Sequence, residues 1–215
     1  MPTRNAEAER LRAILERLRA AYPGVRPGLN HRSPWELLVA TVLSAQCTDE
    51  RVNRKTPALF ARFPTAEALA EADVAEVEGL IRSIGLFRSK ARSLVGMARE
   101  VSGRHGGRVP SEREALEALP GVGRKTASVV LGQAFGTPAF AVDTHVGRVC
   151  RRLGFAEGIE PRAVEDAVTA LLPAGSWVEA HLLLIRHGRV TCTARAPRCP
   201  RCSVRDRCPW PGKAG

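Results

Sequence analysis

The stretch Leu119-Pro120-Gly121-Val122-Gly123-Arg124-Lys125-Thr126 lies between two segments that have helical periodicity. The segment before it, residues 111–118, begins with Ser111-x-x-Glu114, which is the sequence pattern of a capping box. The segment after it covers residues 125–134. The whole arrangement predicts two helices joined by a tight hairpin.

The hairpin itself holds one proline and two glycines. Pro120 ends the first helix because its ring fixes φ. Gly121 and Gly123 allow backbone angles that a β-carbon disfavours, and they let another backbone come close. The second helix therefore presents its N-terminal backbone N–H groups, and such a helix end attracts a phosphate.

Two other interpretations of this stretch compete with a phosphate-binding hairpin. A nucleotide-binding P-loop needs glycine directly before the lysine and another glycine five residues earlier, after a strand. Here Arg124 and Leu119 occupy those positions and a helical segment precedes them, so the pattern does not fit. An ordinary turn between two helices fits the hairpin alone equally well.

The 215-residue chain is 44% hydrophobic and 26% charged, which is typical of a folded protein with a real core. Its formal net charge of +11 favours a polyanionic partner, with nucleic acid as the first candidate. No apolar run reaches the ~20 residues that a membrane span needs. Residues 1–21 lack the apolar core of a signal peptide, so we expect an intracellular protein without disulfides.

Helical periodicity recurs along the chain and no convincing strand pattern is present. Ser33 is predicted to cap one helix with Pro34 at its first position, and Ser176-x-x-Glu179 to cap the last. A polar, glycine-rich break is predicted at residues 103–109. The fold class is predicted to be all-α, with helices near residues 3–21, 34–44, 49–60, 65–70, 74–84, 90–101, 111–118, 125–134, 143–153, 161–172 and 176–190.

Four cysteines lie in one short C-terminal stretch with the spacing Cys-x6-Cys-x2-Cys-x5-Cys. These are Cys192, Cys199, Cys202 and Cys208. In a reducing cell such a group indicates a metal site, and both zinc and a [4Fe–4S] cluster accept four cysteines. The wide outer spacings favour the larger cluster, but spacing alone leaves zinc open. Cys47 and Cys150 lie in apolar segments and are predicted to be small core residues.

The stretch around the four cysteines is rich in arginine, with Asp206 as the one acid among them. A metal-ordered basic loop of this kind suits phosphate binding, and a solvated tail held by a structural metal is compatible with it. The arginines are Arg186, Arg189, Arg195, Arg198, Arg201, Arg205 and Arg207.

Taken in order, five segments of the chain closely resemble the endonuclease III family of bifunctional DNA glycosylases. They are Leu43-Ser44-Ala45-Gln46, Ile84-Gly85-Leu86-Phe87, residues 119–127, Val142-Asp143-Thr144-His145 and the four-cysteine spacing. The resemblance spans about residues 33–208. It departs at Phe87, where the family often has tyrosine, which puts one local contact in doubt.

The resemblance implies two helical domains with DNA in the cleft between them. Residues 27–137 would form a six-helix barrel with the helix–hairpin–helix. Residues 1–26 and 138–215 would form a second domain that holds a [4Fe–4S] cluster on the four cysteines. It further implies a monomer that acts on double-stranded DNA, in the cytoplasm and associated with the nucleoid.

Lys125 is the candidate nucleophile. It lies in the first turn of a helix beside Arg124, and both the helix N-terminus and a neighbouring cation disfavour the ammonium form. An amine that attacks carbon must be uncharged. By itself Lys125 could equally be a phosphate contact; the resemblance assigns it the nucleophile. It also assigns Asp143, otherwise a plain helix N-cap, to assist that amine and to stabilise positive charge on the sugar.

The resemblance also assigns DNA contacts. Gln46 would fill the gap left by a flipped nucleotide and Leu86 would wedge the opposite strand, although Leu86 could be a simple helix-end contact. Ser44, Asp49 and His145 would line the base pocket, with a structural hydrogen bond as the other role open to His145. The remaining expected DNA contacts are Gly121, Val122, Gly123, Arg124, Thr126, Arg195 and Arg198.

The function implied is removal of oxidised pyrimidines from DNA, followed by strand cleavage at the abasic site through a lysine Schiff base. One alternative is a monofunctional adenine or mismatch glycosylase of the same superfamily, which Lys125 argues against because such relatives lack a lysine there. Another is a non-catalytic, metal-stapled DNA-binding module, which only the pair of Lys125 and Asp143 argues against.

Overall fold

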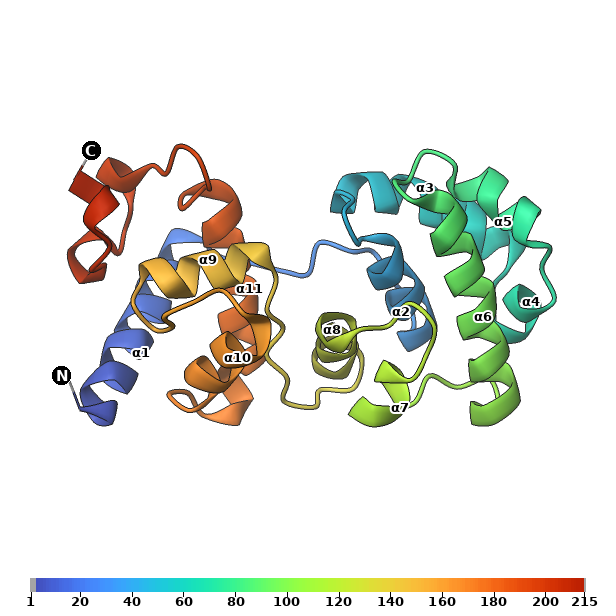
Figure 1. The fold of residues 1–215 in the computed structure, drawn as a ribbon, viewed down its shortest axis with the longest axis horizontal. Coiled ribbons are helices and arrows are strands. Elements are labelled where there is room, and N and C mark those ends of the chain that lie inside the picture. Colours follow the sequence, from blue (N-terminus) through green and yellow to red (C-terminus); the bar gives the residue numbers. More distant parts are fainter. Residues whose placement is uncertain (1–2, 215) are drawn as a thin grey trace. The chain divides into compact units, whose positions relative to one another are not determined.

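The structure is a computed structural model that describes residues 3–214 (Figure 1). Those residues form α-helices and short 3-10 turns and contain no strand, so the all-α prediction is confirmed. Within them, no helix combines the length and the apolar content that a membrane span needs.

The chain divides into two compact units. Unit 2 is the continuous stretch Pro27–Thr137, and unit 1 combines the residues up to Arg26 with those from Pro138 onward. The first helix of the chain therefore packs with the C-terminal helices, across more than a hundred residues of sequence.

Unit 2 is built around α2 (Pro34–Leu43), whose residues from Leu37 to Leu43 are all buried. This explains a helix that is apolar on every face. α2 packs against α8 (Arg124–Ala134), and α6 (Phe87–His105) packs against the short helices beside it. The other helices of this unit are α3 (Asp49–Arg62), α4 (Ala66–Ala70), α5 (Val74–Ile81) and α7 (Arg113–Glu117).

Unit 1 contains α1 (Arg4–Ala21), α9 (Thr144–Arg152), α10 (Pro161–Thr169) and α11 (Trp177–Val190). One apolar cluster joins them. Its fully buried members include Leu11, Ile14, Leu18, Phe140, Val146, Val149, Leu183 and Leu184. The apolar stripe predicted for α1 is thus the face that closes this core.

Some predicted helix starts are confirmed and others are wrong. The Ser33 hydroxyl accepts from the Glu36 N–H at 3.2 Å and caps α2 as predicted. Ser111 does not cap α7, because its hydroxyl donates to the Glu112 carboxylate and the helix begins two residues later, at Arg113. Ser176 does not cap α11 either.

The Ser176 hydroxyl donates instead to the Pro173 carbonyl at 2.8 Å, within the 3-10 turn Ala174–Ser176 that leads into α11. In both failed cases the serine hydroxyl bonds another local group instead, which is the competition that serine offers around helix ends.

The predicted break at residues 103–109 lies too early. α6 starts at Phe87 rather than near Lys90, continues through Gly103, and ends only at Gly106, whose φ is +56°. A left-handed glycine of this kind is a common helix C-cap. Buried residues as late as Val101 hold the last turns of the helix in place.

Candidate functional site

The hairpin between α7 and α8 is fixed by Gly121. Its φ is +79°, and an added β-carbon would lie 2.9 Å from the Ser93 β-carbon, so only glycine fits without movement. The Val122 N–H donates to the Leu119 carbonyl at 3.0 Å, and the Val122 side chain is only 5% exposed. Val122 therefore holds the turn together, and its side chain does not reach outward as a DNA contact would.

The backbone angles predicted for Gly123 are wrong, whereas the room predicted beside it is present. Its φ of −101° is an ordinary extended value, so no left-handed backbone requires glycine here. No atom lies within 4 Å of the place where its β-carbon would be. The missing side chain leaves open space directly in front of α8, where a DNA backbone could approach.

Lys125 is the second residue of α8, after Arg124 and before Thr126. All three side chains are half-buried, and the first turn of the helix contains no acidic residue. The N-terminus of α8 carries the positive end of the helix dipole, which attracts anions. The prediction that Lys125 starts this helix is confirmed to within one residue.

Asp143 is the N-cap of α9, as its position in the sequence indicated. Its Oδ1 accepts from the backbone N–H groups of His145 at 2.9 Å and Val146 at 2.8 Å. A carboxylate has a second oxygen with its own acceptor sites, so capping and a chemical role are compatible. The side chain is half-buried.

Gln46 and Leu86 share an unusual backbone conformation. They are the only non-glycine residues with positive φ among residues 3–214, at 52° and 59°. Both are exposed, and 59% of Leu86 is accessible to solvent. Residues other than glycine rarely adopt a positive φ, and backbone strain of this kind is common at functional sites.

The two segments that carry Gln46 and Leu86 lie side by side. A β-carbon added to Gly85 would be 3.7 Å from the Gln46 carbonyl oxygen. Residues some forty positions apart in the sequence thus form one exposed edge of unit 2.

The three residues expected to line a base pocket each have a structural partner. Ser44 donates its hydroxyl to the Thr41 carbonyl at 2.8 Å at the end of α2. The Asp49 carboxylate lies against Gly28, where a β-carbon would be 2.4 Å from Oδ2. His145 Nδ1 lies 3.1 Å from an Arg148 guanidinium nitrogen.

The four C-terminal cysteines line a single pocket of unit 1, together with residues that include Arg152, His187 and Trp210. All four are half-buried, and none of the four is in a disulfide. No three His, Cys, Asp or Glu side chains between residues 3 and 214 are arranged to hold a metal ion. A metal cluster is therefore favoured by the convergence of the four cysteines on one pocket, and not by side chains already arranged as ligands.

Arg152 supports this cysteine loop, which we define as residues 191–208. It is 6% exposed, and its guanidinium donates to the Cys192 sulfur at 3.3 Å, the Thr193 carbonyl at 2.7 Å and the Ala194 carbonyl at 3.0 Å. It also lies 4.1 Å from the centre of the Trp210 ring. Arg152 has no distinguishing sequence feature, because nothing in its spacing sets it apart from the arginines around it.

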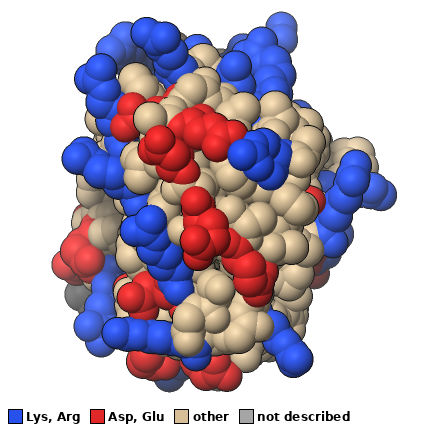
Figure 2. All heavy atoms as spheres, turned by 90° about the vertical axis from the view of Figure 1, so that its right-hand side faces the viewer, with Lys and Arg blue, Asp and Glu red and all other residues tan. Residues whose placement is uncertain are grey.

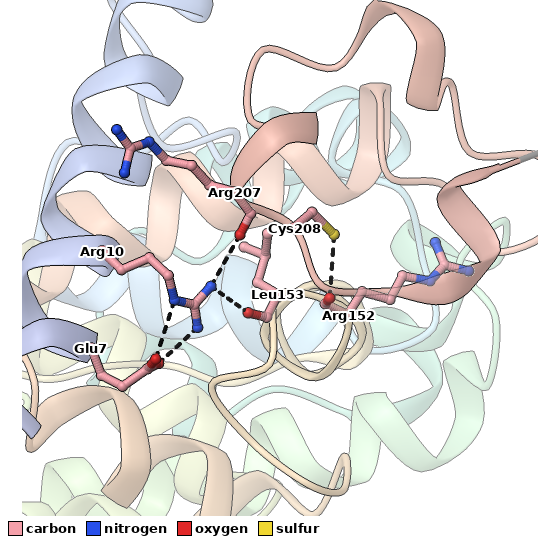
Figure 3. A network of polar contacts seen from close by, with 6 residues as sticks. All are labelled: Glu7, Arg10, Arg152, Leu153, Arg207 and Cys208. Atoms are coloured by element: carbon pink, nitrogen blue, oxygen red, sulfur yellow. Dashed lines mark hydrogen bonds and ion pairs between the residues drawn. The ribbon is translucent and has the colours of Figure 1, made fainter. Parts of the chain in front are cut away.

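Arg10 of α1 supports the other end of the loop (Figure 3). Its guanidinium donates to the carbonyls of Leu153 at 2.8 Å and Arg207 at 3.2 Å, and pairs with Glu7 at 2.7 Å. This contact ties the N-terminal helix to the residue before Cys208.

The predicted phosphate-binding arginines of the loop, Arg195 and Arg198, are exposed. Asp206, the one acid of the loop, bonds Arg17 of α1 at 2.6 Å. Its charge is thus directed at α1 rather than at the loop's own arginines.

Of the remaining cysteines, Cys150 is fully buried as predicted, and burial raises the pKa of its thiol to about 12. Cys47 differs from the prediction, because it lies half-buried in the turn after α2 rather than in a helix core.

Lys90 is a further residue for which the sequence analysis gave no function. It is 5% exposed on α6, and its ammonium donates to two backbone carbonyls next to Gln46. A signal existed, since the position falls on the apolar face that also carries Leu94, Ala98 and Val101.

Charge is uneven over the surface. Figure 2 shows the face that lies to the right in Figure 1, over α4 and α5, where acidic side chains form a band with Lys and Arg side chains around it. These helices and their ends contribute the exposed residues Glu67, Glu71, Asp73 and Glu76. The acidic band itself does not suit a polyanion.

Comparisons with known proteins agree with one another. Residues 39–174 match the model of the HhH-GPD superfamily of base excision DNA repair proteins. The chain is 48% identical to endonuclease III of Escherichia coli K12 over 96% of this chain and 98% of that protein. It is 46% identical to endonuclease III of Synechocystis over 95% and 94%.

Solved structures give the same result. A trapped endonuclease III–DNA covalent intermediate is similar with a TM-score of 0.91 and 40% identity, over 100% of this chain and 99% of the other. A thermostable thymine-DNA glycosylase is similar with a TM-score of 0.87 and 26% identity, over 97% and 99%. On these matches and on the hairpin, the cysteine spacing and the helical fold, the chain belongs to the endonuclease III family of the HhH-GPD superfamily.

Proposed function

We propose that this protein is a base excision repair DNA glycosylase that removes oxidised pyrimidines from double-stranded DNA and cleaves the strand at the resulting abasic site. Its family relatives are endonuclease III enzymes that match almost the whole chain. The observation that carries the proposal is the place of Lys125 in the first turn of α8, two residues after Gly123, where space is open.

Lys125 is the nucleophile in this proposal. The positive end of the α8 dipole disfavours the ammonium form of Lys125. A neutral amine can attack C1′ of a deoxyribose that has been pulled from the helix. The half-buried position limits the water around the amine without closing off the substrate.

The reaction proceeds by bonds that the Lys125 amine can make and release. The amine nitrogen bonds to C1′, and the base leaves with the electron pair of the glycosidic bond and takes up a proton. Loss of the nitrogen proton and opening of the sugar ring give a Schiff base. Removal of a C2′ proton then expels the 3′ phosphate by β-elimination, and water hydrolyses the imine to release the enzyme.

Asp143 is proposed to supply the carboxylate for this chemistry. It accepts a proton from the Lys125 ammonium and stabilises positive charge that develops on the sugar. The two N–H bonds to its Oδ1 fix the side chain, and the other oxygen supplies the charge. A fixed carboxylate needs no reorganisation when that charge appears.

The DNA contacts fall into two groups. The α8 N-terminus, with Gly121, Gly123, Arg124 and Thr126, and the loop residues Arg195 and Arg198 bind phosphates, while Val122 sets the turn. Gln46 fills the place of the flipped nucleotide and Leu86 parts the opposite strand. Ser44, Asp49 and His145 are the proposed neighbours of the flipped base. The enzyme acts as a monomer, and its binding to DNA would place it on the nucleoid.

A [4Fe–4S] cluster is proposed on Cys192, Cys199, Cys202 and Cys208. The donor set fits, because four thiols line one pocket and sulfur is the ligand that iron–sulfur clusters require. When bound, the cluster cross-links the cysteine loop and thereby orders its arginines. Purified protein should contain iron and absorb near 400 nm, whereas zinc-rich, colourless protein would contradict the assignment.

Trapping with borohydride tests the proposed activity. Wild-type protein incubated with an abasic-site duplex and borohydride should form a covalent adduct, because hydride reduces the Schiff base to a stable amine. Lys125→Gln should form none. A wild-type protein that binds the duplex without an adduct would leave only the DNA-binding module or the monofunctional enzyme.

A panel of duplexes then separates those two and defines the substrate. We expect release of oxidised pyrimidines and no release of adenine from mismatches. Adenine release without strand cleavage would instead support the monofunctional alternative.

A further inference from the structure

Among residues 3–214 the buried ammonium of Lys90 has two backbone partners and no acidic one within hydrogen-bond distance. It donates to the Leu43 carbonyl at 2.9 Å and the Ala45 carbonyl at 2.5 Å. Lysine is almost never fully buried unless it is paired. Burial lowers its pKa, and the Cys47 thiol opposes that shift. Burial of this ammonium therefore costs free energy of desolvation, which indicates that Lys90 has a specific role.

The two acceptors lie at the end of α2, just before Gln46. Leu43 is the last residue of that helix, and its carbonyl is one of those left without a partner inside the helix. A cation at this end also complements the helix dipole. The bond from the ammonium to the Ala45 carbonyl fixes the backbone directly before Gln46, which has the left-handed conformation.

Lys90 is also joined to the Leu86 segment through its backbone. The Lys90 N–H donates to the Leu86 carbonyl at 3.0 Å in the first turn of α6, and the Ser89 hydroxyl donates to the same carbonyl at 3.0 Å. Gly85 lies against the Gln46 carbonyl. One residue thus holds both exposed segments, one by its main chain and the other by its side chain.

Both segments need such support. Gln46 and Leu86 are in a conformation that a side chain seldom adopts, and strain of this kind persists only where the surroundings hold it. Neither side chain is packed, since both are exposed. Support must therefore come from the buried side of the two segments. Lys90 is the buried polar group that contacts both of them.

We propose that Lys90 is a positioning residue that fixes the Gln46 and Leu86 segments relative to each other, so that both enter the DNA together during base flipping. This inference rests on the proposed roles of those two residues. Lys90 itself touches no DNA and acts through the two segments. A simple helix-capping role would change stability alone.

The test compares Lys90→Met, which keeps the length and removes the donors, with Lys55→Met on α3, which removes the same charge from the same unit. Full-length protein is mixed with a duplex that carries an oxidised pyrimidine next to 2-aminopurine. The fluorescence rise reports flipping, and single-turnover base release is followed in parallel.

Lys90→Met should slow the fluorescence rise and base release by about tenfold or more, because small misplacements at a site have effects of this size. Lys55→Met should stay within about twofold of wild type. Unchanged flipping in a Lys90→Met protein of lowered thermal stability would reduce Lys90 to a helix cap and overturn the proposal.

A double-mutant cycle tests the positioning role of Lys90 separately from the proposed DNA contacts of Gln46 and Leu86. In a Gln46→Ala, Leu86→Ala background, Lys90→Met should slow flipping by less than about twofold, because residues that act through each other are not additive. Fully multiplicative effects would overturn the positioning role. If Gln46→Ala and Leu86→Ala do not slow flipping at all, the proposed DNA contacts fail instead.

Should Lys90→Met fail to fold, Lys90→Arg takes its place in the same cycle. Its guanidinium keeps the charge and the donors but is wider and planar. A smaller loss of the same non-additive kind is expected. Additive losses contradict the proposal here as well.

Discussion

The hairpin of unit 2 and the cysteine loop of unit 1 are both short irregular segments with proposed roles in binding DNA, but different interactions hold them. The hairpin depends on its own backbone, through the left-handed Gly121 and the bond from Val122 to Leu119. The cysteine loop depends on guanidinium groups from outside it, chiefly Arg152 and Arg10.

The two units also differ in net charge. Unit 1 has 18 Lys and Arg against 10 Asp and Glu, a net charge of +8, whereas unit 2 has 15 against 12, a net charge of +3. The proposed nucleophile thus belongs to the nearly balanced unit. Most of the basic excess belongs to the unit with the proposed cluster.

This contrast suggests a division of tasks. A backbone-defined turn places one amine with little dependence on surrounding charge, which is what covalent chemistry requires. A loop held by arginines and a metal cluster offers many cations with less exact placement, which suits contacts to phosphates. Chemistry and affinity should therefore respond to different substitutions.

The largest effect is expected for Lys125→Gln. Strand cleavage at an abasic site should fall by about a thousandfold or more, because no other group would form the Schiff base. The free energy of unfolding should change by less than ~0.5 kcal/mol, since the side chain is only half-buried. A gel assay and urea denaturation measure the two quantities. Cleavage within tenfold of wild type would remove Lys125 from the chemistry.

The next effect concerns Arg152→Met, which should destabilise the iron-loaded protein by about 3 kcal/mol. Two loop carbonyls and the Cys192 sulfur lose a charged donor in a buried place. Arg151→Met, on the exposed neighbour in α9, should change stability by less than ~0.5 kcal/mol. Urea denaturation measures both. Equal losses for the two variants would mean that Arg152 does not support the loop.

Asp143 can be split into its two roles by Asp143→Ser and Asp143→Ala. Serine keeps an N-cap acceptor, so its stability should match wild type, whereas alanine should lose about 1 kcal/mol. Both should release the damaged base about a hundredfold more slowly, because both lack the charge. If Asp143→Ser retained near wild-type base release in single-turnover assays, capping would be the whole role of this residue.

The smallest effect separates the two glycines of the hairpin. Gly121→Ala should destabilise the protein by about 1–2 kcal/mol, because alanine must take φ +79° and displace Ser93. Gly123→Ala should change stability by less than ~0.5 kcal/mol, since its backbone is extended and open space surrounds it. Thermal unfolding compares the pair. A reversed order would show that the hairpin is held in another way.

Much of the fold follows from patterns within a few residues of each other. The start of α2 at Ser33 and Pro34 and the cap of α9 at Asp143 were predicted because side chain and backbone partner lie within three residues. The same reasoning failed at Ser111 and Ser176, where the hydroxyl bonds another local group, the Glu112 carboxylate and the Pro173 carbonyl respectively.

What sequence patterns could not supply are the long-range contacts. Several glycines in the sequence could have ended α6. Packing along the helix determines that it ends at Gly106. Arg152 resembles a surface cation in the sequence, and the place of Lys90 on an apolar face does not show what it binds, yet both are buried on backbone carbonyls supplied by distant segments. Their partners are set by tertiary structure, which no local spacing records.

Mapping the amine that borohydride fixes to abasic DNA tests the central claim most directly. The chain has four lysines, Lys55, Lys90, Lys125 and Lys213, so digestion and mass spectrometry of the trapped adduct can assign the modified residue without ambiguity. We expect the deoxyribose remnant on the peptide that contains Lys125. Its presence on another lysine or on the N-terminal amine, with Lys125 unmodified, would contradict the proposed mechanism.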